Sequence, residues 1–209
     1  GPNEDLEAYP RDFDRDSALC ESIGADLIFC PSPAEMYHYP HAFVSIDTLS
    51  DTLCGKTRPI HFKGVCTVVS KLFNIVKPDR AYFGQKDAQQ LAIIRRMVLD
   101  LNFDIQIVGC PIVREEDGLA LSSRNKRLSA EERENALNIS RTLFKSRNFA
   151  ATHTVSETQK MVEDAIEAAP GLRLEYFEIV DGNTLQKIND WEDTSYAVGC
   201  ITVFCGEVR

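Results

Sequence analysis

The fold is decided at residues 83–90, which read Phe83-Gly84-Gln85-Lys86-Asp87-Ala88-Gln89-Gln90. The residues just before, Asp79 to Phe83, are predicted to form a short strand, and Asp87 and Gln90 have the spacing of a capping box for a following helix. A strand that leads directly into a helix N-terminus is a common phosphate site in α/β proteins. Lys86 would face the positive end of that helix, which is unfavourable by up to about 1 kcal/mol unless an anion joins it. We therefore expect a bound phosphate here.

A second anion site is predicted in the loop Leu121-Ser122-Ser123-Arg124-Asn125, which follows the turn signal Asp117-Gly118. Two hydroxyls, backbone N–H groups and a guanidinium in one short loop can surround a polyphosphate. The whole chain has a net charge of -9, so Arg124, Lys126 and Arg127 form a local basic cluster in an acidic background. An acidic chain of this kind is not expected to bind nucleic acid.

Composition describes an ordinary globular protein of one domain or two small ones. The 209 residues are 44% hydrophobic, which is enough to build a substantial core. The sequence has no apolar run of the roughly 18 residues that a membrane span needs, and the start Gly1-Pro2-Asn3-Glu4-Asp5 does not resemble a signal peptide. We therefore expect a cytoplasmic protein that does not contact membranes.

The cysteines and histidines do not predict a metal site. The seven cysteines are odd in number and have no CxxC spacing, so we expect reduced, buried thiols. His38 and His41 are three residues apart, but Tyr39-Pro40 between them indicates a loop.

The first half of the chain alternates between helix and strand patterns, as in half of a doubly wound parallel sheet. The expected elements, in order, are a helix over Ser17 to Ile23 ended by Gly24, a strand over Asp26 to Cys30, a loop with Pro31, Pro33 and Pro40, an extended piece over Ala42 to Ile46, a helix over Gly64 to Val76 ended by Lys77-Pro78, the strand before Gly84, a helix through Leu91 to Leu101, and a strand over Ile105 to Gly109.

The second half is predicted to be a smaller α+β unit that begins near Val113. Ser129 to Glu132 reads as a capping box for a long helix to about Phe149, and Thr154 to Glu157 opens a further helix. Two apolar strands are expected after it, over Leu174 to Val180 and Tyr196 to Phe204. The serine-arginine loop, residues 121–125, would then lie at the junction of the two units.

Three motifs, in the order and with the spacing that they have in this sequence, resemble the motifs of the pantothenate synthetase (pantoate:β-alanine ligase) family. They are Arg58-Pro59-Ile60-His61-Phe62-Lys63-Gly64-Val65, the 83–90 segment and the 121–125 loop. The opening Pro2-Asn3-Glu4-Asp5-Leu6 with Tyr9-Pro10-Arg11 is similar to a family segment as well. The resemblance covers nearly the whole chain.

The resemblance implies a Rossmann-like nucleotidyltransferase fold, with residues 1–113 binding nucleotide and pantoate and residues 114–209 forming a smaller α+β lid domain. It implies an AMP-forming ligase that makes pantoyl adenylate and pyrophosphate from pantoate and ATP, after which β-alanine displaces AMP to give pantothenate. It also implies Mg²⁺ carried by the ATP phosphates and a homodimer.

Roles for individual residues come from the same resemblance. The residues implied to contact ATP are Gly84, Lys86, Asp87, Val113, Leu121, Ser122, Ser123 and Arg124. Those implied to bind pantoate are Gln90, Arg58 and His61. Of these, Lys86, Ser122, Ser123, Arg124 and His61 would also act in catalysis, by neutralising and aligning the phosphates, and no protein-held metal is expected.

The sequence departs from the family pattern in two places. The family's His-x-Gly-His segment and its Asn-Pro-x-Gln-Phe glutamine would lie upstream of Gly1, so the first domain is expected to be incomplete and the 209-residue chain alone to be inactive. Leu121 stands where the family usually has methionine, a change between flexible apolar groups of similar volume.

Other interpretations remain for each motif and for the whole chain. Taken singly, Asp87 with Gln90 could be only a helix cap, residues 122–125 an ordinary polar turn, Lys86 a solvated lysine and His61 a structural histidine. A different adenylyl or cytidylyl transferase would share the fold, and pyrophosphate exchange with alternative acids would separate it. A non-catalytic nucleotide-binding module is the remaining class, which a turnover assay would test.

Overall fold

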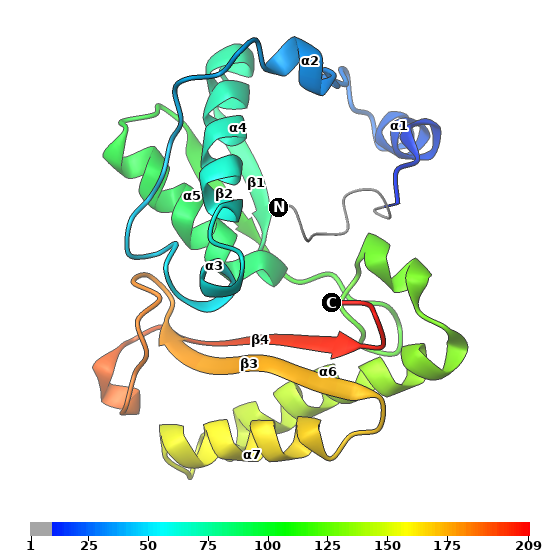
Figure 1. The fold of residues 1–209 in the computed structure, drawn as a ribbon, viewed down its shortest axis with the longest axis vertical. Helices are drawn as coiled ribbons and strands as arrows, with labels where there is room; N and C mark the ends of the chain where they lie inside the picture. Colours follow the sequence, from blue (N-terminus) through cyan, green and yellow to red (C-terminus); the bar gives the residue numbers. More distant parts are fainter. Residues whose placement is uncertain (1–9) are drawn as a thin grey trace.

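The computed structural model describes residues 10–209, and it contains two small sheets, each packed with its own helices (Figure 1). The opening motif from Pro2 to Leu6, together with Tyr9, lies outside the described residues. The elements of the first half are α1 (Phe13–Ser22), α2 (Pro33–Met36), α3 (Leu53–Thr57), α4 (His61–Val76), β1 (Arg80–Gly84), the 3-10 turn η1 (Gln85–Asp87), α5 (Ala88–Asp100) and β2 (Gln106–Cys110). Those of the second half are η2 (Ser123–Arg127), α6 (Ala130–Phe149), α7 (Val155–Glu167), β3 (Leu172–Asp181), η3 (Trp191–Asp193) and β4 (Ala197–Cys205).

The first sheet confirms the predicted parallel arrangement. β1 and β2 pair in parallel, in a register that runs from Arg80 opposite Gln106 to Gly84 opposite Cys110. α4 enters β1 and α5 leaves it, so the N-termini of both helices lie at the carboxyl edge of the sheet (Figure 1). The shared core is Phe62, Cys66, Phe73, Ile93, Ile94 and Met97. This packing fixes the two helix starts relative to the sheet edge.

The helix predicted over Gly64 to Val76 is confirmed as α4, which begins three residues earlier, at His61. Its apolar residues recur at helical spacing, and Cys66 on that face is fully buried. The helix ends where Lys77 adopts a left-handed conformation with φ of 50°, directly before Pro78. A left-handed C-cap followed by proline is a common helix stop, so the structure confirms the stop predicted at Lys77-Pro78.

The second half forms the expected α+β unit. β3 and β4 pair antiparallel, and α6 and α7 cover one face of this sheet (Figure 1). Both predicted helix starts are confirmed as capping boxes, Ser129 with Glu132 and Thr154 with Glu157. The core of this unit is Val155, Val162, Ile166, Phe177, Ile179, Ile188 and Val203.

The strand predicted over Asp26 to Cys30 is wrong. Within residues 10–209 no other strand pairs with this segment, and Leu27 in it is 77% exposed. A strand needs a partner for its backbone groups, which an apolar pattern alone does not guarantee. Nearby, the predicted proline loop contains the single-turn helix α2, capped by Ser32, and the segment from Ala42 to Ile46 runs outside any sheet.

The first helix is longer than the prediction from Ser17. It begins at Phe13, since Asp12 accepts a hydrogen bond from the Arg15 backbone N–H as an N-cap. Its end agrees with the prediction, because Gly24 follows with φ of 82°.

The predicted capping box of Asp87 and Gln90 is also wrong. Asp87 does precede α5, but among the described residues its carboxylate accepts no capping hydrogen bond. The 3-10 turn η1 tightens the chain just before the helix, so Asp87 is held with φ of -97° and ψ of 60°. Its side chain is therefore available for other contacts.

The cysteines are only partly as predicted. All seven lie in the described part of the chain and are free thiols, but only Cys66 and Cys205 are buried. Burial raises the pKa of the Cys66 thiol to about 11, as expected for an inert core cysteine. Cys30 is exposed because its segment forms no strand. No helix among residues 10–209 has the length and apolar character of a membrane span.

The Ser129 capping box gives a direct test of the second unit. Ser129→Ala removes the hydroxyl that accepts from the Glu132 backbone N–H at 3.2 Å, and should lower the free energy of unfolding by about 1 kcal/mol. Urea denaturation measures this change. The control is Ser156→Ala in the first turn of α7, an exposed position that should change the free energy by less than about 0.5 kcal/mol. Equal effects would show that the cap does not stabilise α6.

Candidate functional site

Gly84, Lys86 and Asp87, three of the residues predicted to contact ATP, lie at the carboxyl edge of the β1–β2 sheet. β1 ends at Gly84, opposite the last residue of β2, Cys110, and Lys86 follows in η1. A Cβ atom built at Gly84 would meet no atom of residues 10–209 within 4 Å, so these residues leave the space above Gly84 open. In open parallel sheets, ligands bind beyond the carboxyl ends of the strands. Residues 83–90, where the sequence predicts a phosphate site, therefore lie at the edge where such ligands bind.

Lys86 has a carboxylate neighbour that the sequence interpretation did not include. Its Nζ lies 3.7 Å from Asp87 Oδ1, and the two side chains are 40% and 62% exposed. An ion pair this exposed is weak, but it partly offsets the unfavourable position of Lys86 at the helix start. The helix dipole alone therefore does not require a bound phosphate, and Lys86 remains accessible to one.

A short hairpin returns the chain from β2 to the same edge. The Leu121 backbone N–H donates to the Val113 carbonyl at 2.9 Å, and Arg114 and Ala120 form an antiparallel bridge. The Val113 and Leu121 side chains are 65% and 57% exposed. Two adjacent exposed apolar residues beside a polar site form a surface suited to a flat aromatic ring. The hairpin thus joins two residues that the sequence separates by eight positions.

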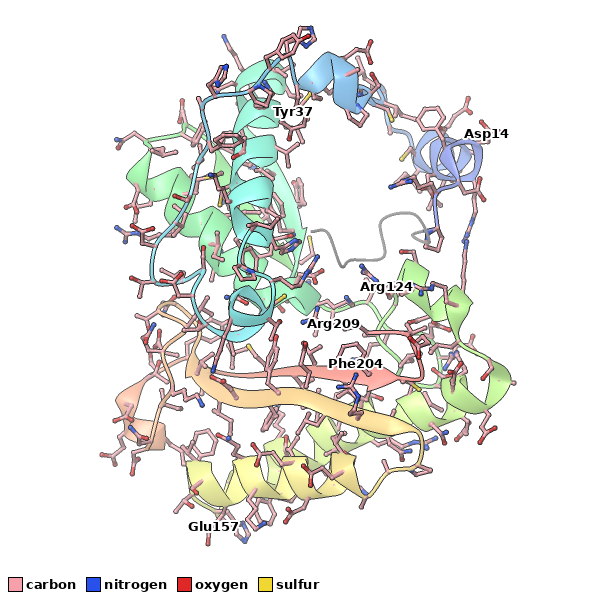
Figure 2. All side chains as sticks on the ribbon, viewed as in Figure 1. Asp14, Tyr37, Arg124, Glu157, Phe204 and Arg209 are labelled. Carbon is pink, nitrogen blue, oxygen red and sulfur yellow. The ribbon has the colours of Figure 1, made fainter. Side chains whose placement is uncertain are left out.

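The serine-arginine loop follows that hairpin directly. The Arg124 backbone N–H donates to Ser122 Oγ at 3.3 Å, which leaves the Ser122 hydroxyl proton for another acceptor. Ser123 and Arg124 begin the 3-10 turn η2, and both are half-buried. Figure 2 shows Arg124 at the start of η2, above the C-terminal end of β4 in this view. The neighbouring Lys126 is exposed.

An ionic network that the sequence did not predict anchors this loop. Asn125 Nδ2 donates to Glu115 Oε1 at 2.8 Å and to the Ala120 carbonyl at 3.0 Å. Arg133 Nη2, from α6, contacts Glu115 Oε2 at 2.7 Å and Asp117 Oδ2 at 2.6 Å. The hydrogen bond from the Leu119 backbone N–H, together with Arg133, lowers the pKa of Asp117. The only sequence signal was the Asp117-Gly118 turn.

The predicted pantoate residues lie at the starts of α4 and α5. His61 is the first residue of α4, and its backbone N–H donates to the Arg58 carbonyl at 3.0 Å. The His61 ring packs edge-on against Phe62, with centroids 5.0 Å apart, and Arg58 Nη1 lies 3.8 Å from Cys54 Sγ. Gln90 is half-buried in the first turn of α5. Both helix starts lie at the carboxyl edge of the sheet, while Arg58 lies three residues before α4 as the C-cap of α3.

His38 and His41 belong to no larger cluster of metal-ligating side chains among the described residues. Among residues 10–209, no group of three or more His, Cys, Asp or Glu side chains is arranged to hold a metal ion, and His38 and His41 lie in the loop after α2. A cavity of about 150 Å³ lies between α5 and the β3–β4 sheet, and it is lined by Gln85, Arg95, Tyr196 and apolar neighbours. None of the site residues predicted above is among its described lining residues.

Comparisons with known proteins identify the family of this chain. The family model described as pantoate-beta-alanine ligase matches residues 1–209. Pantothenate synthetase from Bacteroides thetaiotaomicron is 68% identical over 209 residues, which are 98% of this chain and 73% of that protein. A relative of the same name from Ruminiclostridium cellulolyticum is 50% identical and matches 100% of this chain and 75% of its own length.

Solved structures show the same fold. The crystal structure of pantothenate synthetase from Thermus thermophilus has a TM-score of 0.90 at 44% identity, covering 98% of this chain and 78% of that one. Pantoate-beta-alanine ligase from Francisella tularensis, complexed with beta-gamma ATP and beta-alanine, has a TM-score of 0.72 at 30% identity, covering 98% and 74%. The fold is the nucleotidyltransferase-like α/β fold of these enzymes, and the chain belongs to the pantoate-beta-alanine ligase family.

Proposed function

We infer that this ligase activates pantoate with ATP and joins it to β-alanine at the carboxyl edge of the β1–β2 sheet. The observation that carries the placement is the convergence, at one edge, of Lys86, the hairpin that ends in Leu121 and the starts of α4 and α5. The Francisella enzyme, which shares this fold, was solved with an ATP analogue and β-alanine. These features support a site for a nucleotide and a small carboxylic acid.

The first step forms an acyl adenylate. A pantoate carboxylate oxygen attacks the α-phosphorus of ATP, a P–O bond forms, and the bond to pyrophosphate breaks, with its electron pair leaving on pyrophosphate. This step needs alignment and charge neutralisation rather than a protein nucleophile. We assign these tasks to Lys86, Arg124 and the Ser122 and Ser123 hydroxyls. Lys86 is accessible, and Ser122 keeps a proton to donate.

The base of ATP is assigned to the surface of Val113 and Leu121, beside Gly84 and Asp87. The two apolar side chains are exposed at this edge, and Gly84 leaves open space above the strand end. Leucine in place of the family's usual methionine keeps a flexible apolar contact. Gln90, Arg58 and His61 are assigned to pantoate because the starts of α4 and α5, with Arg58 three residues before α4, lie at the same edge of the sheet as Lys86.

The second step forms the amide. The β-alanine amine attacks the acyl carbon of the adenylate, a C–N bond forms, and the C–O bond to AMP breaks. The amine loses its proton, and AMP leaves with the electron pair. The chain contributes the enclosure and orientation of the adenylate in this step.

Mg²⁺ is proposed to arrive with ATP. The phosphates of ATP would hold the ion, as is common for Mg²⁺, and Asp87 provides a carboxylate beside Lys86. When bound, the ion would neutralise charge on the phosphates.

We also propose two units, residues 1–113 and 114–209, and a cytoplasmic homodimer. One core within each unit supports the division, with the cluster of Leu53, Ala92, Val180 and Leu185 packed between the units. The free thiols support the location, and family analogy supports the dimer.

The adenylation step can be tested alone. The full-length protein should exchange labelled pyrophosphate into ATP when pantoate is present and β-alanine is absent, because adenylate formation is reversible without the second substrate. β-Alanine should be required only for release of AMP and pantothenate. Other hydroxy acids of similar size serve as the matched controls. Exchange that is independent of pantoate, or that requires β-alanine, would contradict the proposal.

A further inference from the structure

Gln89, next to the proposed pantoate ligand Gln90, is one of the few buried polar side chains described. It is 6% exposed, and its Nε2 donates to the carbonyls of Leu49 and Thr52, both at 2.8 Å. These carbonyls belong to the loop before α3, about 40 residues away in sequence. The orientation of the amide is fixed, because a carboxamide oxygen in this place would face two other oxygens. Gln89 is therefore a bridge between α5 and this loop.

The bridged segment, residues 48–55, consists of the loop before α3 and the first residues of α3, and it has an unfavourable backbone. Thr48 and Leu53 adopt positive φ angles of 70° and 51°. Such angles are rare for non-glycine residues, and especially for a β-branched one, and they persist only where surrounding contacts hold them. At Gly55, a side chain would collide with the Ser50 carbonyl oxygen. The two bonds from Gln89 and the buried Leu53 side chain, 3% exposed, are contacts that hold this conformation.

The loop leads directly into the residues assigned to pantoate. α3 begins at Leu53, the Arg58 backbone N–H donates to the Cys54 carbonyl at 2.9 Å, and the His61 N–H donates to the Arg58 carbonyl. A shift of the loop would therefore pass through α3 to Arg58 and His61. Gln90, in contrast, belongs rigidly to α5. Gln89 therefore sets the distance between Gln90 on α5 and the residues Arg58 and His61, which together form the proposed pantoate site.

The burial of Gln89 is poorly explained by stability alone. Its Oε1 accepts no hydrogen bond from any described residue, and an unpaired buried acceptor is destabilising. An apolar residue would suit the adjoining cluster of Leu53, Ala92, Val180 and Leu185 better. The two donated bonds are the feature that an apolar residue could not reproduce.

We propose that Gln89 is a positioning residue, which holds the loop before α3 so that Arg58 and His61 face Gln90 across the pantoate site. This inference rests on the proposed pantoate site. Gln89 itself touches no substrate. Its effect is on the geometry of pantoate binding, and not on ATP, because the Lys86 turn and the serine-arginine loop are held by other contacts.

The test is Gln89→Met in the full-length protein, which keeps the side-chain volume and removes both donated bonds. The KM for pantoate in the exchange reaction should rise about tenfold, as expected when an oriented binding group is displaced, with the KM for ATP within about twofold. The matched control is Thr158→Val in α7. It removes a bond from a side chain that is 2% exposed to the Thr154 carbonyl, and should lower stability without changing the pantoate KM.

The outcomes separate this inference from the proposed site. If Gln90→Met leaves the pantoate KM unchanged, the pantoate site itself is wrong. If Gln90→Met raises it but Gln89→Met behaves like Thr158→Val, or raises both KM values equally, Gln89 has only a structural role. Should Gln89→Met fail to fold, Gln89→Asn carries the same expectation, since its amide is one methylene too short to reach both carbonyls.

Discussion

Lys86→Ala should lower the rate of pantoyl adenylate formation by about 10² or more, because a positioned cation at developing phosphate charge is typically worth a few kcal/mol. The fold should remain intact, since the side chain is 40% exposed and its neighbour Asp87 is 62% exposed. Single-turnover measurement of adenylate formation from ATP and pantoate tests the rate. Thermal unfolding of the same variant tests the fold.

A matched lysine in the second unit provides the control. Lys160 on α7 also has a carboxylate neighbour, with Nζ 2.9 Å from Asp164 Oδ1, and its side chain is 75% exposed. Lys160→Ala should change the rate by less than about twofold, as expected for an exposed ion pair away from the chemistry. Normal turnover by Lys86→Ala would make Lys86 a surface lysine and would place the phosphate site elsewhere.

The sequence predicted those elements whose signals are local. Helical spacing and the Lys77-Pro78 stop located α4, and the capping boxes at Ser129 and Thr154 located α6 and α7. In each, the residues that form the signal also make the contact, so no distant partner was needed. The parallel pairing of β1 with β2 followed from the helix between them, because a short crossover of this kind joins parallel strands.

The wrong predictions concern segments whose structure depends on distant residues or on the conformation of the preceding backbone. The apolar segment from Asp26 to Cys30 has a strand pattern but pairs with no strand among the described residues. At Asp87 the capping-box spacing is present, yet the preceding 3-10 turn holds the residue away from capping geometry. Pattern alone reports the preference of a segment, and the surrounding structure can override it.

The roles of the site residues stay predictions, and the contacts that hold these residues in place were not predicted from the sequence. The residue roles came from the family resemblance, and the two anion loops came from the residues themselves. The Glu115–Arg133 contact spans 18 positions, and Gln89 reaches a loop about 40 positions away, so neither has a periodic signal. Gln89 and Gln90 are chemically identical neighbours, and only the packing of α5 distinguishes the buried one from the half-buried one.

Arg124→Ala is expected to raise the ATP requirement and to slow adenylation by roughly 10 to 10³, on the scale of losing a charge-assisted contact to phosphate. Arg124 follows Ser122 and Ser123 in a loop whose shape is fixed by the hydrogen bond from Asn125 to Glu115. A fixed loop presents its donors in one arrangement. Arg124→Lys should therefore recover only part of the rate, because an ammonium group cannot reproduce bidentate contacts.

The neighbouring Lys126 distinguishes a shaped site from a basic patch. It is exposed, two residues beyond Arg124 in the same turn, and it carries the same charge. If general electrostatic attraction held ATP, both alanine variants would lose similar amounts of activity. We expect Lys126→Ala to lose less than about threefold, as for a screened surface charge. Steady-state kinetics of Arg124→Ala, Arg124→Lys and Lys126→Ala distinguish a shaped site from a basic patch. The hydrogen bond from Asn125 to Glu115 anchors the loop and orients Arg124, but it does not orient Lys126. Equal losses of activity in Arg124→Ala and Lys126→Ala would therefore refute the shaped loop.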